Sequence, residues 1–163
     1  MSTEILSLYH RITRWPAGHW LFSRAVCIKA PYFGTIAPRF VTLAPGRCEV
    51  RMRDRRRVHN HLGTVHAIAL CNLAELAAGV MTDATLPPAM RWIPKGMSVE
   101  YLKKATGTMK AVATPECPLD ISEAGYDAPV LVEVSDNKGD VVFRARIAMW
   151  VSPRPARAGT SPG

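Results

Sequence analysis

Side chains that could do chemistry gather in one stretch of the chain, from residue 58 to residue 82. The polar residues His59, Asn60 and His61 come first, and Glu75 follows inside an almost unbroken apolar segment. A carboxylate can act as a general base or a nucleophile, whereas imidazole and amide groups can orient or polarise a substrate. The stretch therefore supplies the groups that acid–base or acyl-transfer chemistry needs.

Glu75 is the first candidate for a catalytic group. No Lys or Arg occurs between Val65 and Met81, so this carboxylate has no local partner. Burial would raise its pKa toward the range that is useful for a general base. The alternative is a structural carboxylate that lies at a rim or pairs with a distant arginine.

The apolar segment must position these groups, and its composition predicts a helix. Residues 65–81 are rich in Ala and Leu and contain no proline. Because apolar residues occur all around this helix, we expect it to be buried. Thr64, after Gly63, stands where an N-cap is expected. The free backbone N–H groups and the positive dipole end at this point predict a site for a developing negative charge.

The composition indicates one domain that binds an anionic partner. The 163 residues include 21 Lys and Arg against 13 Asp and Glu, which gives a net charge of +8. This excess favours phosphorylated cofactors, nucleic acid or acidic lipid. No basic motif interleaved with aromatic residues and no helix-turn-helix pattern accompanies it, so we expect no nucleic-acid partner.

Cysteine usage and the N-terminal sequence predict a cytoplasmic protein. The N-terminus lacks the apolar run and small-residue cleavage site of a secretory signal. Segment 65–81 is short for a membrane span and contains His, Asn and Glu, so we expect no membrane insertion. The four cysteines form no CxxC pair, which predicts reduced thiols: Cys27, Cys48, Cys71 and Cys117.

The element order predicts an α+β fold. Helical patterns occur at 2–14, 19–26 and 65–81, and strand patterns occur at 35–44, 47–53, 97–102, 108–114, 130–135 and 141–149. We expect a curved antiparallel sheet of about six strands wrapped around the long helix. The predicted organisation is an N-terminal helical extension at 1–34, one domain at 35–151 and a disordered tail at 152–163.

The segment Asn60-His61-Leu62-Gly63-Thr64-Val65-His66, followed nine residues later by Glu75, resembles the signature of hotdog-fold acyl-CoA thioesterases. The phenylacetate-pathway branch of that family is the most similar. The resemblance in element order extends over residues 35–151. It implies the hotdog fold, hydrolysis of an acyl-CoA to a carboxylic acid and CoA, no cofactor, and a homodimer or a dimer of dimers.

The resemblance also implies a role for each residue of the motif. Glu75 matches the carboxylate that activates water or attacks the thioester carbonyl. The backbone N–H near Ala67 matches the donor that polarises this carbonyl, and Asn60 matches a residue that orients the carbonyl or the water. His66 matches the motif histidine at the helix start. The residues beside these four are expected to contact substrate: Gly63, Thr64 and Ile68.

The chain departs from the family pattern at one point. Ala67-Ile68 stands where the family has Gly-Gly, and glycine permits a closer approach of backbone to ligand. A non-catalytic acyl-CoA or fatty-acyl binding or sensor protein is therefore the alternative function. A hotdog dehydratase or hydratase is a third option, but no His-Asp pairing of the hydratase kind occurs around the helix.

Helix geometry predicts that the site is shared between subunits. His66 and Glu75 are nine residues apart, which places them about 13 Å apart on roughly opposite faces of one helix. A site that uses both must combine the helix start of one chain with Glu75 of another. The arginine run Arg55-Arg56-Arg57 is a candidate clamp for the CoA phosphates, or else a solvated loop.

A metal site is the last alternative. His59, His61, His66 and Glu75 are suitable ligand types. Their spacing matches no known zinc pattern, and Glu75 lies too far along the helix to join the others. We therefore expect loop histidines and no metal.

Overall fold

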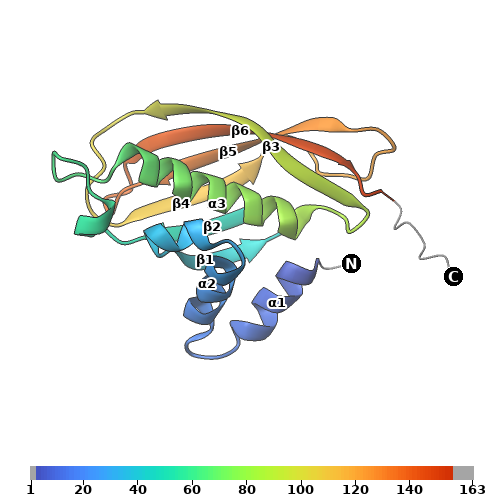
Figure 1. Ribbon diagram of the computed structural model, residues 1–163, viewed down its shortest axis with the longest axis horizontal. Helices are drawn as coiled ribbons and strands as arrows, with labels where there is room; N and C mark the ends of the chain where they lie inside the picture. The colour runs from blue at the N-terminus through green and yellow to red at the C-terminus, as the bar shows by residue number, and fades with distance from the viewer. Residues whose placement is uncertain (1–2, 156–163) are drawn as a thin grey trace, which may run out of the picture.

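The computed structural model describes residues 3–155, and Figure 1 shows one layer of sheet with a long helix across it. The helical elements are α1 (Glu4–Ile12), α2 (Gly18–Lys29), the 3-10 helix η1 (Pro31–Ile36), the 3-10 helix η2 (Arg56–Val58) and α3 (Ala67–Thr85). The strands are β1 (Arg39–Ala44), β2 (Arg47–Met52), β3 (Met90–Tyr101), β4 (Met109–Pro115), β5 (Tyr126–Ser135) and β6 (Val141–Pro153).

The six strands form one sheet in the order β1-β2-β4-β5-β6-β3, and every neighbouring pair is antiparallel. The sheet curves around α3, which lies across its inner face (Figure 1). This is the α+β hotdog architecture predicted from the sequence. The strands β1 and β3 are the two edges, because each pairs with one neighbour only.

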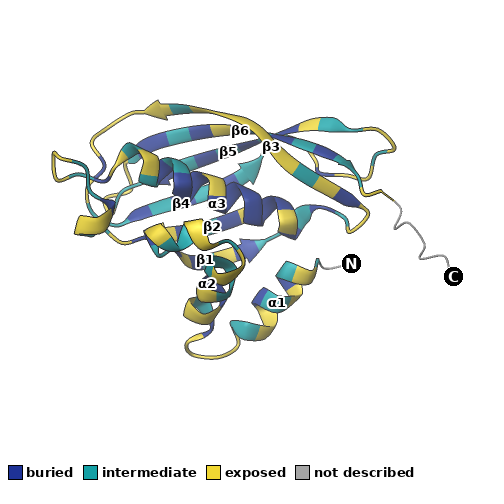
Figure 2. Cartoon of the chain, viewed as in Figure 1, coloured by how far each residue is buried: buried dark blue, intermediate teal, exposed yellow. Residues whose placement is uncertain are grey.

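Alternating side chains on the strands build the core against α3. In β2 the residues Cys48, Val50 and Met52 are fully buried, whereas Arg47 and Arg51 are exposed. The inner positions of β4, β5 and β6 repeat this pattern (Figure 2). Burying this apolar surface is the main favourable contribution to folding, at about 25 cal/mol per Å².

Helix α3 is apolar enough and long enough to cross a membrane, but two thirds of its residues lie inside the protein. Its buried side chains include Leu70, Leu73, Leu76 and Met81. This is the environment of a core helix, as we expected from its all-round apolar sequence.

One face of α3 points at the edge strand β3 and is less completely covered. Its residues recur every three or four positions: Ile68, Cys71, Glu75, Gly79 and Asp83. Near the helix end this face is closed, because the Trp92 indole N–H donates to Asp83 at 2.6 Å. A Cβ on Gly79 would lie 3.0 Å from the Trp92 ring, so the small residue permits this packing.

The first two helices cover the opposite edge of the sheet. Tyr9 of α1, Phe22 of α2 and Phe40 of β1 stack edge to face, with ring centroids 5.1 Å apart in each successive pair. The Tyr9 hydroxyl donates to the carbonyl of Val41 at 3.0 Å. Edge strand β1 is therefore packed against its own chain's helices, which lie below it in Figure 1.

Several predicted boundaries were wrong. Residues 35–38 belong to η1 and the turn after it, so the first strand begins at Arg39. Strand β3 begins at Met90, well before the predicted 97, and contains a bulge between Pro94 and Gly96. Strand β6 ends at Pro153, and the rest of the predicted tail from 156 lies outside the described residues.

Candidate active site

The start of α3 is capped by a histidine side chain. His66 is the N-cap, and its Nδ1 accepts a hydrogen bond from the backbone N–H of Ile68 at 3.0 Å. The prediction that Thr64 is the N-cap was therefore wrong. Because Nδ1 is an acceptor, the neutral His66 ring carries its proton on Nε2. This Nε2–H belongs to an exposed side chain and is available to a ligand.

Ala67 is the first residue of α3, and its backbone N–H has no hydrogen-bond partner in residues 3–155. The next three N–H groups are occupied: Ile68 donates to the His66 ring, and Ala69 and Leu70 donate to the His66 carbonyl. Ala67 N–H is thus the open donor at the positive end of the helix dipole. It is the same group that the sequence motif indicates.

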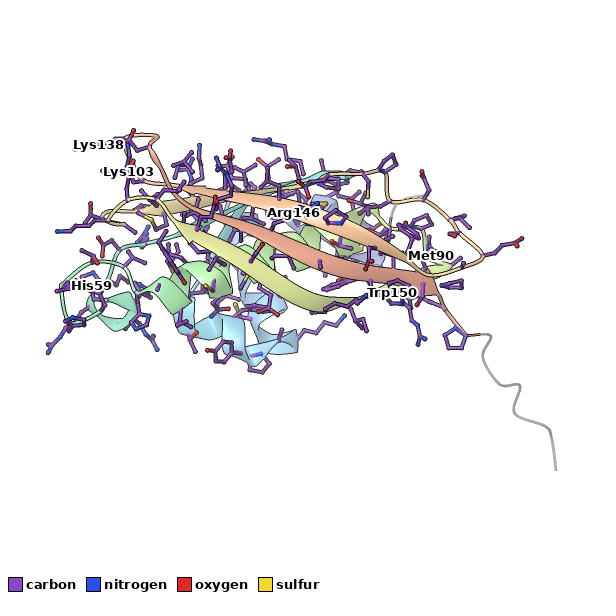
Figure 3. The ribbon with its side chains drawn as sticks, turned by 90° about the horizontal axis from the view of Figure 1, so that it is seen from above. His59, Met90, Lys103, Lys138, Arg146 and Trp150 are labelled. Carbon is purple, nitrogen blue, oxygen red and sulfur yellow. The ribbon has the colours of Figure 1, made fainter. Side chains whose placement is uncertain are left out.

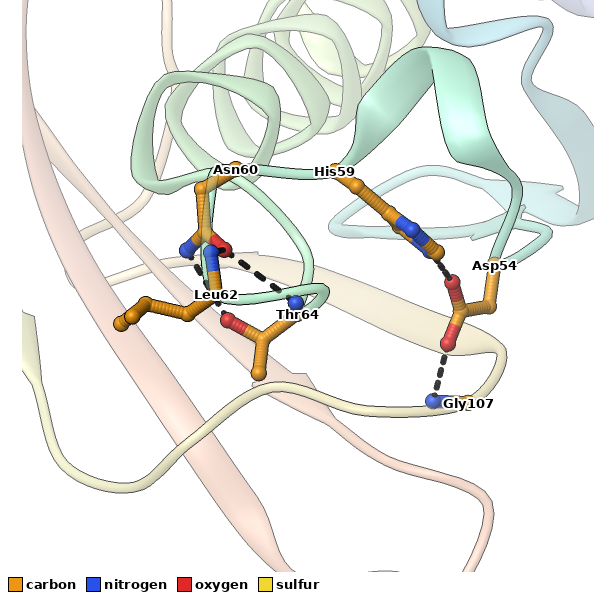
Figure 4. A network of polar contacts seen from close by, with 6 residues as sticks. All are labelled: Asp54, His59, Asn60, Leu62, Thr64 and Gly107. Carbon is orange, nitrogen blue, oxygen red and sulfur yellow. Dashed lines mark hydrogen bonds and ion pairs between the residues drawn. The ribbon is translucent and has the colours of Figure 1, made fainter.

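Asn60 holds the turn before the helix. Its Oδ1 accepts from the backbone N–H of Leu62 at 2.9 Å and of Thr64 at 3.2 Å, and its Nδ2 donates to the Thr64 hydroxyl at 2.9 Å (Figure 4). Gly63 has a φ of 74°, which glycine adopts without strain. The structure therefore uses Asn60 and Thr64 to fix the turn, and it leaves one Nδ2 hydrogen of Asn60 available.

Asp54 anchors the same segment from the other side. Its carboxylate contacts the His59 ring and accepts the backbone N–H of Gly107 at 2.7 Å (Figure 4). Although burial alone would raise the pKa of Asp54, the hydrogen bonds from His59 and Gly107 and the charge of His59 together lower it. The pair ties the segment before α3 to the turn that leads into β4.

Glu75 lies on the exposed side of α3, so the expectation of a buried carboxylate was wrong for the isolated chain. Beside it is a groove of about 280 Å³ formed by Ile147 and by the bulged part of β3, residues 94–97. Glu75 has no ion pair or hydrogen bond within residues 3–155. A carboxylate of this kind is free to act on a molecule that enters the groove.

A sulfur and a phenol meet at the other end of the same helix face. Cys71 Sγ lies 3.4 Å from the hydroxyl of Tyr101, the last residue of β3. This contact and partial burial raise the pKa of Tyr101 to about 12, so the phenol stays neutral at physiological pH. The pair lies between Ile68 and Glu75 along α3, and nothing in the sequence alone places Tyr101 there.

Strand β3 is an open edge with apolar side chains. Ile93 is 57% exposed and Met97 is 40% exposed. Most of the strand is yellow in Figure 2, in contrast to its neighbour β6. Figure 3 shows that β3 runs from Met90, at the end of the molecule that holds Trp150, toward the end that holds His59. A long apolar edge with unpaired backbone groups is a surface that proteins normally cover.

The structure separates the three consecutive arginines. Arg56 and Arg57 lie in η2 and are exposed. The Arg55 side chain instead binds η1, where its Nη2 donates to the carbonyl of Ile36 at 3.1 Å. The three guanidinium groups do not form one cluster.

The histidines are not brought together. His59 contacts Asp54, His66 caps α3 and His61 is exposed on the turn. In residues 3–155 no group of three or more His, Cys, Asp or Glu side chains is arranged to hold a metal ion.

Similar structures have the same fold. A protein from a structural-genomics programme is 47% identical, with a TM-score of 0.77 over 93% of this chain and 97% of its own. A probable thioesterase from Pseudomonas aeruginosa is 20% identical, with a TM-score of 0.69 over 78% of this chain and 91% of its own. A thioesterase from Haemophilus influenzae is 13% identical, with a TM-score of 0.67 over 78% and 87%.

These likenesses confirm the predicted resemblance to the hotdog fold of thioesterases. The sequence matches no curated protein. Residues 18–151 match a family described as a domain of unknown function, DUF4442. The match covers most of the chain, from α2 to the end of the sheet. The chain therefore belongs to the DUF4442 family, and it carries the hotdog fold that thioesterases share.

Proposed function

We propose that this protein hydrolyses acyl-CoA thioesters to a carboxylic acid and CoA. The observation that carries the proposal is the exposed, unpaired Glu75 above the groove of edge strand β3. Thioester hydrolysis needs a base or nucleophile together with a donor for the oxyanion. Glu75 supplies the first of these groups, and the open N–H of Ala67 supplies the second.

The proposed site combines two subunits. Glu75 lies eight positions after Ala67 in the helix, which corresponds to about 12 Å along the axis. One thioester carbonyl cannot reach both groups of a single chain. Pairing of two β3 edges around a two-fold axis would cover the apolar side chains Ile93 and Met97 and bring each Glu75 toward the partner's helix start. A homodimer is thus the smallest active unit.

The proposed reaction is electrostatic and acid–base. The thioester carbonyl oxygen accepts hydrogen bonds from Ala67 N–H and His66 Nε2–H of one subunit. Glu75 of the partner subunit takes a proton from water, and the water oxygen forms a bond to the carbonyl carbon. The C–S bond then breaks, and the thiolate of CoA leaves and takes the proton from Glu75. A thiol pKa of about 8.5 makes this thiolate a good leaving group.

In an alternative form of this mechanism, Glu75 acts as the nucleophile. Its carboxylate would attack the carbonyl carbon, expel the thiolate and form an anhydride, which water then hydrolyses. A single turnover in ¹⁸O-labelled water distinguishes the two routes. Label incorporated into Glu75 would indicate an anhydride that water attacks at the Glu75 carbonyl carbon, whereas label in the product acid alone would indicate a general base or an anhydride attacked at the acyl carbon.

The exposed arginines Arg56 and Arg57 are the proposed contacts for the phosphate groups of CoA. Reversing both to Glu should raise the Michaelis constant for an acyl-CoA much more than that for a short thioester without the nucleotide. An equal effect on the two substrates would count against this contact.

The experiment that tests the function is a thiol-release assay on acyl-CoA substrates from short to long chain, with aromatic ones included. The wild type and Glu75→Gln are compared, and the exposed position of Glu75 should allow the variant to fold. We expect hydrolysis by the wild type and a loss of at least about a thousandfold in the variant. Equal rates for the two proteins would overturn the role of Glu75.

The second candidate is a binding protein for acyl-CoA. Ile68 favours it, because this side chain is 56% exposed beside the open donor of Ala67, where the resembling family has glycine. Binding of acyl-CoA without thiol release by the wild type would support this candidate. In that case Ile68→Gly tests whether crowding at the helix start prevents the reaction.

A further inference from the structure

A second cavity lies far from the Glu75 groove, between α2 and strands β1 and β2. Its volume is about 680 Å³, and it shares no lining residue with the groove. Helix α2 contributes one wall through residues of a single face, among them His19, Trp20 and Arg24. The segment from 37 to 41 and the outward side of β2 form the opposite wall.

Five arginines line this cavity, and no Asp or Glu is among the described residues that form its walls. They come from four segments of the chain: Arg24, Arg39, Arg51, Arg53 and Arg55. Arg51 forms a loose ion pair with Glu49 at 3.5 Å. The other four have no ion pair with any residue between 3 and 155.

An anion would stabilise this arrangement. Arg39 and Arg51 are direct partners in the antiparallel register of β1 and β2. Like charges at directly opposed positions destabilise a sheet. An anion between the guanidinium groups would replace this repulsion by charge-assisted hydrogen bonds, which arginine forms in pairs with phosphate oxygens.

Two polar atoms at the cavity also lack partners. Arg55 Nε and His19 Nδ1 are shielded from solvent and have no hydrogen bond within the described chain. Both residues line the cavity, from opposite walls. Because water does not reach these two atoms, a ligand in the cavity would bind instead to the exposed guanidinium groups of Arg24, Arg39 and Arg53.

We propose that this cavity binds a nucleoside phosphate, with its phosphate groups held by the arginines and its base against Trp20. The volume is in the range of sites for small molecules. Trp20 is 57% exposed at the cavity wall, where an aromatic surface can stack on a base. The site is independent of the proposed thioesterase function, because none of its residues takes part in that reaction.

Titration calorimetry on the full-length protein tests the proposal, with ATP, inorganic tripolyphosphate and adenosine as probes at physiological salt. We expect one ATP per chain, weaker binding of tripolyphosphate and no detectable binding of adenosine. Arg39→Gln with Arg53→Gln should weaken ATP binding at least tenfold. Arg24→Gln is a single change on the exposed surface of the helix and should also weaken ATP binding. This variant replaces the double variant if the double variant fails to fold.

Matched controls distinguish binding in the cavity from non-specific binding of anions to a basic protein. Arg47 lies on the same strand as Arg51, is exposed and does not line the cavity, so Arg47→Gln should change ATP affinity less than twofold. Trp20→Ala should weaken the binding of ATP several-fold and leave the affinity for tripolyphosphate unchanged. Glu75→Gln should leave the affinities for ATP and for tripolyphosphate unchanged.

Three results would overturn the proposal. One is the absence of ATP and tripolyphosphate binding at millimolar concentration. Another is an equal loss of ATP affinity in Arg47→Gln and in the cavity variants. The third is tight binding of a single-stranded oligonucleotide without binding of ATP, which would assign the arginines to a polyanion.

Discussion

The two edges of the sheet differ in whether the chain's own helices cover them. At β1 the chain covers its own edge, because α1 and α2 pack the rings of Tyr9 and Phe22 against Phe40. At β3 the chain leaves a long strand open, with Ile93 and Met97 exposed. The charges are distributed differently as well, since the covered edge carries the arginine cavity and the open edge carries the lone Glu75.

This difference supports the proposed position of a second subunit at the open edge. An edge strand with exposed apolar side chains tends to pair with another chain. The part of α3 that faces it carries Glu75, whereas the open donor of Ala67 is at the helix start. We infer that the covered edge stabilises the single chain and that the open edge completes the site.

Charges on the open edge should have the largest effect. Ile93→Asp with Met97→Asp changes side chains that are exposed in one chain, so the chain should fold. Two buried charges per subunit would prevent pairing of the β3 edges. We expect a monomeric mass by light scattering at micromolar concentration and a loss of thioesterase activity of at least about a thousandfold.

The matched control places the same charges on the covered edge. Leu21 and Ile28 of α2 are also exposed apolar residues, the latter at 77%. Leu21→Asp with Ile28→Asp should keep both the assembly and the activity. A loss of assembly in this control variant, with assembly intact in the β3 variant, would reverse the assignment of the two edges.

Removing the open donor should have the next largest effect. Ala67→Pro deletes one N–H that has no partner, and proline is favoured at the first position of a helix. The extended backbone of His66 is also compatible with a following proline. We expect kcat to fall by about a hundredfold to a thousandfold. Ala67→Ser keeps the N–H and should stay close to the wild-type rate, and equal losses in both variants would exclude this donor.

Substitution of Asp54 should change the free energy of unfolding more than the rate of hydrolysis. Asp54→Ala removes the contacts with His59 and Gly107, which should cost about 1–3 kcal/mol in the free energy of unfolding. Chemical denaturation monitored by circular dichroism measures this cost. Lys95→Ala, which removes a surface ion pair with Asp127, should cost less than about 1 kcal/mol. Equal losses would mean that Asp54 is only a surface group.

The Asp54 interaction should also depend on pH. Its pKa is lower in the folded protein than the ordinary value of about 3.9. Its contribution to stability is therefore present above that pH and is lost as the pH falls through the folded pKa. The difference in unfolding free energy between wild type and Asp54→Ala should thus shrink in this acidic range. A difference that stays constant down to complete protonation would contradict the lowered pKa.

The smallest expected effect is at the wall of the arginine cavity. Ala37 has a φ of 43°, in the left-handed region that glycine adopts more readily. Ala37→Gly relieves this strain but increases the entropy of the unfolded chain. We expect a stabilisation of no more than about 1 kcal/mol by thermal denaturation. A clear destabilisation would mean that the Ala37 methyl group contributes more packing than strain.

The sequence was sufficient to predict the fold because its patterns are strong where burial is complete. The alternation in β2 and the apolar helix both predicted their elements correctly. Strand β3 was missed over its first half because Pro94 and Gly96 usually interrupt strands. They are tolerated at a bulge on an open edge, and only the assembled sheet shows that this strand is an edge.

The site was predicted less completely because its contacts join distant segments. Thr64 has the chemistry of an N-cap, but Asn60 binds it within the turn and His66 takes the capping position. The exposure of Glu75 could not be predicted from an all-apolar helix, because it depends on where the sheet ends. The spacing of Glu75, Gly79 and Asp83 was the one available signal of a separate helix face.

Subunit complementation tests the shared site most directly. Glu75→Gln and Ala67→Pro chains are each inactive alone in our account, because every site lacks one group. A heterodimer restores one complete site, so a statistical mixture of equal chains should recover about one quarter of the wild-type activity. Activity in the mixture equal to the average of the two separate variants would contradict a site shared between subunits.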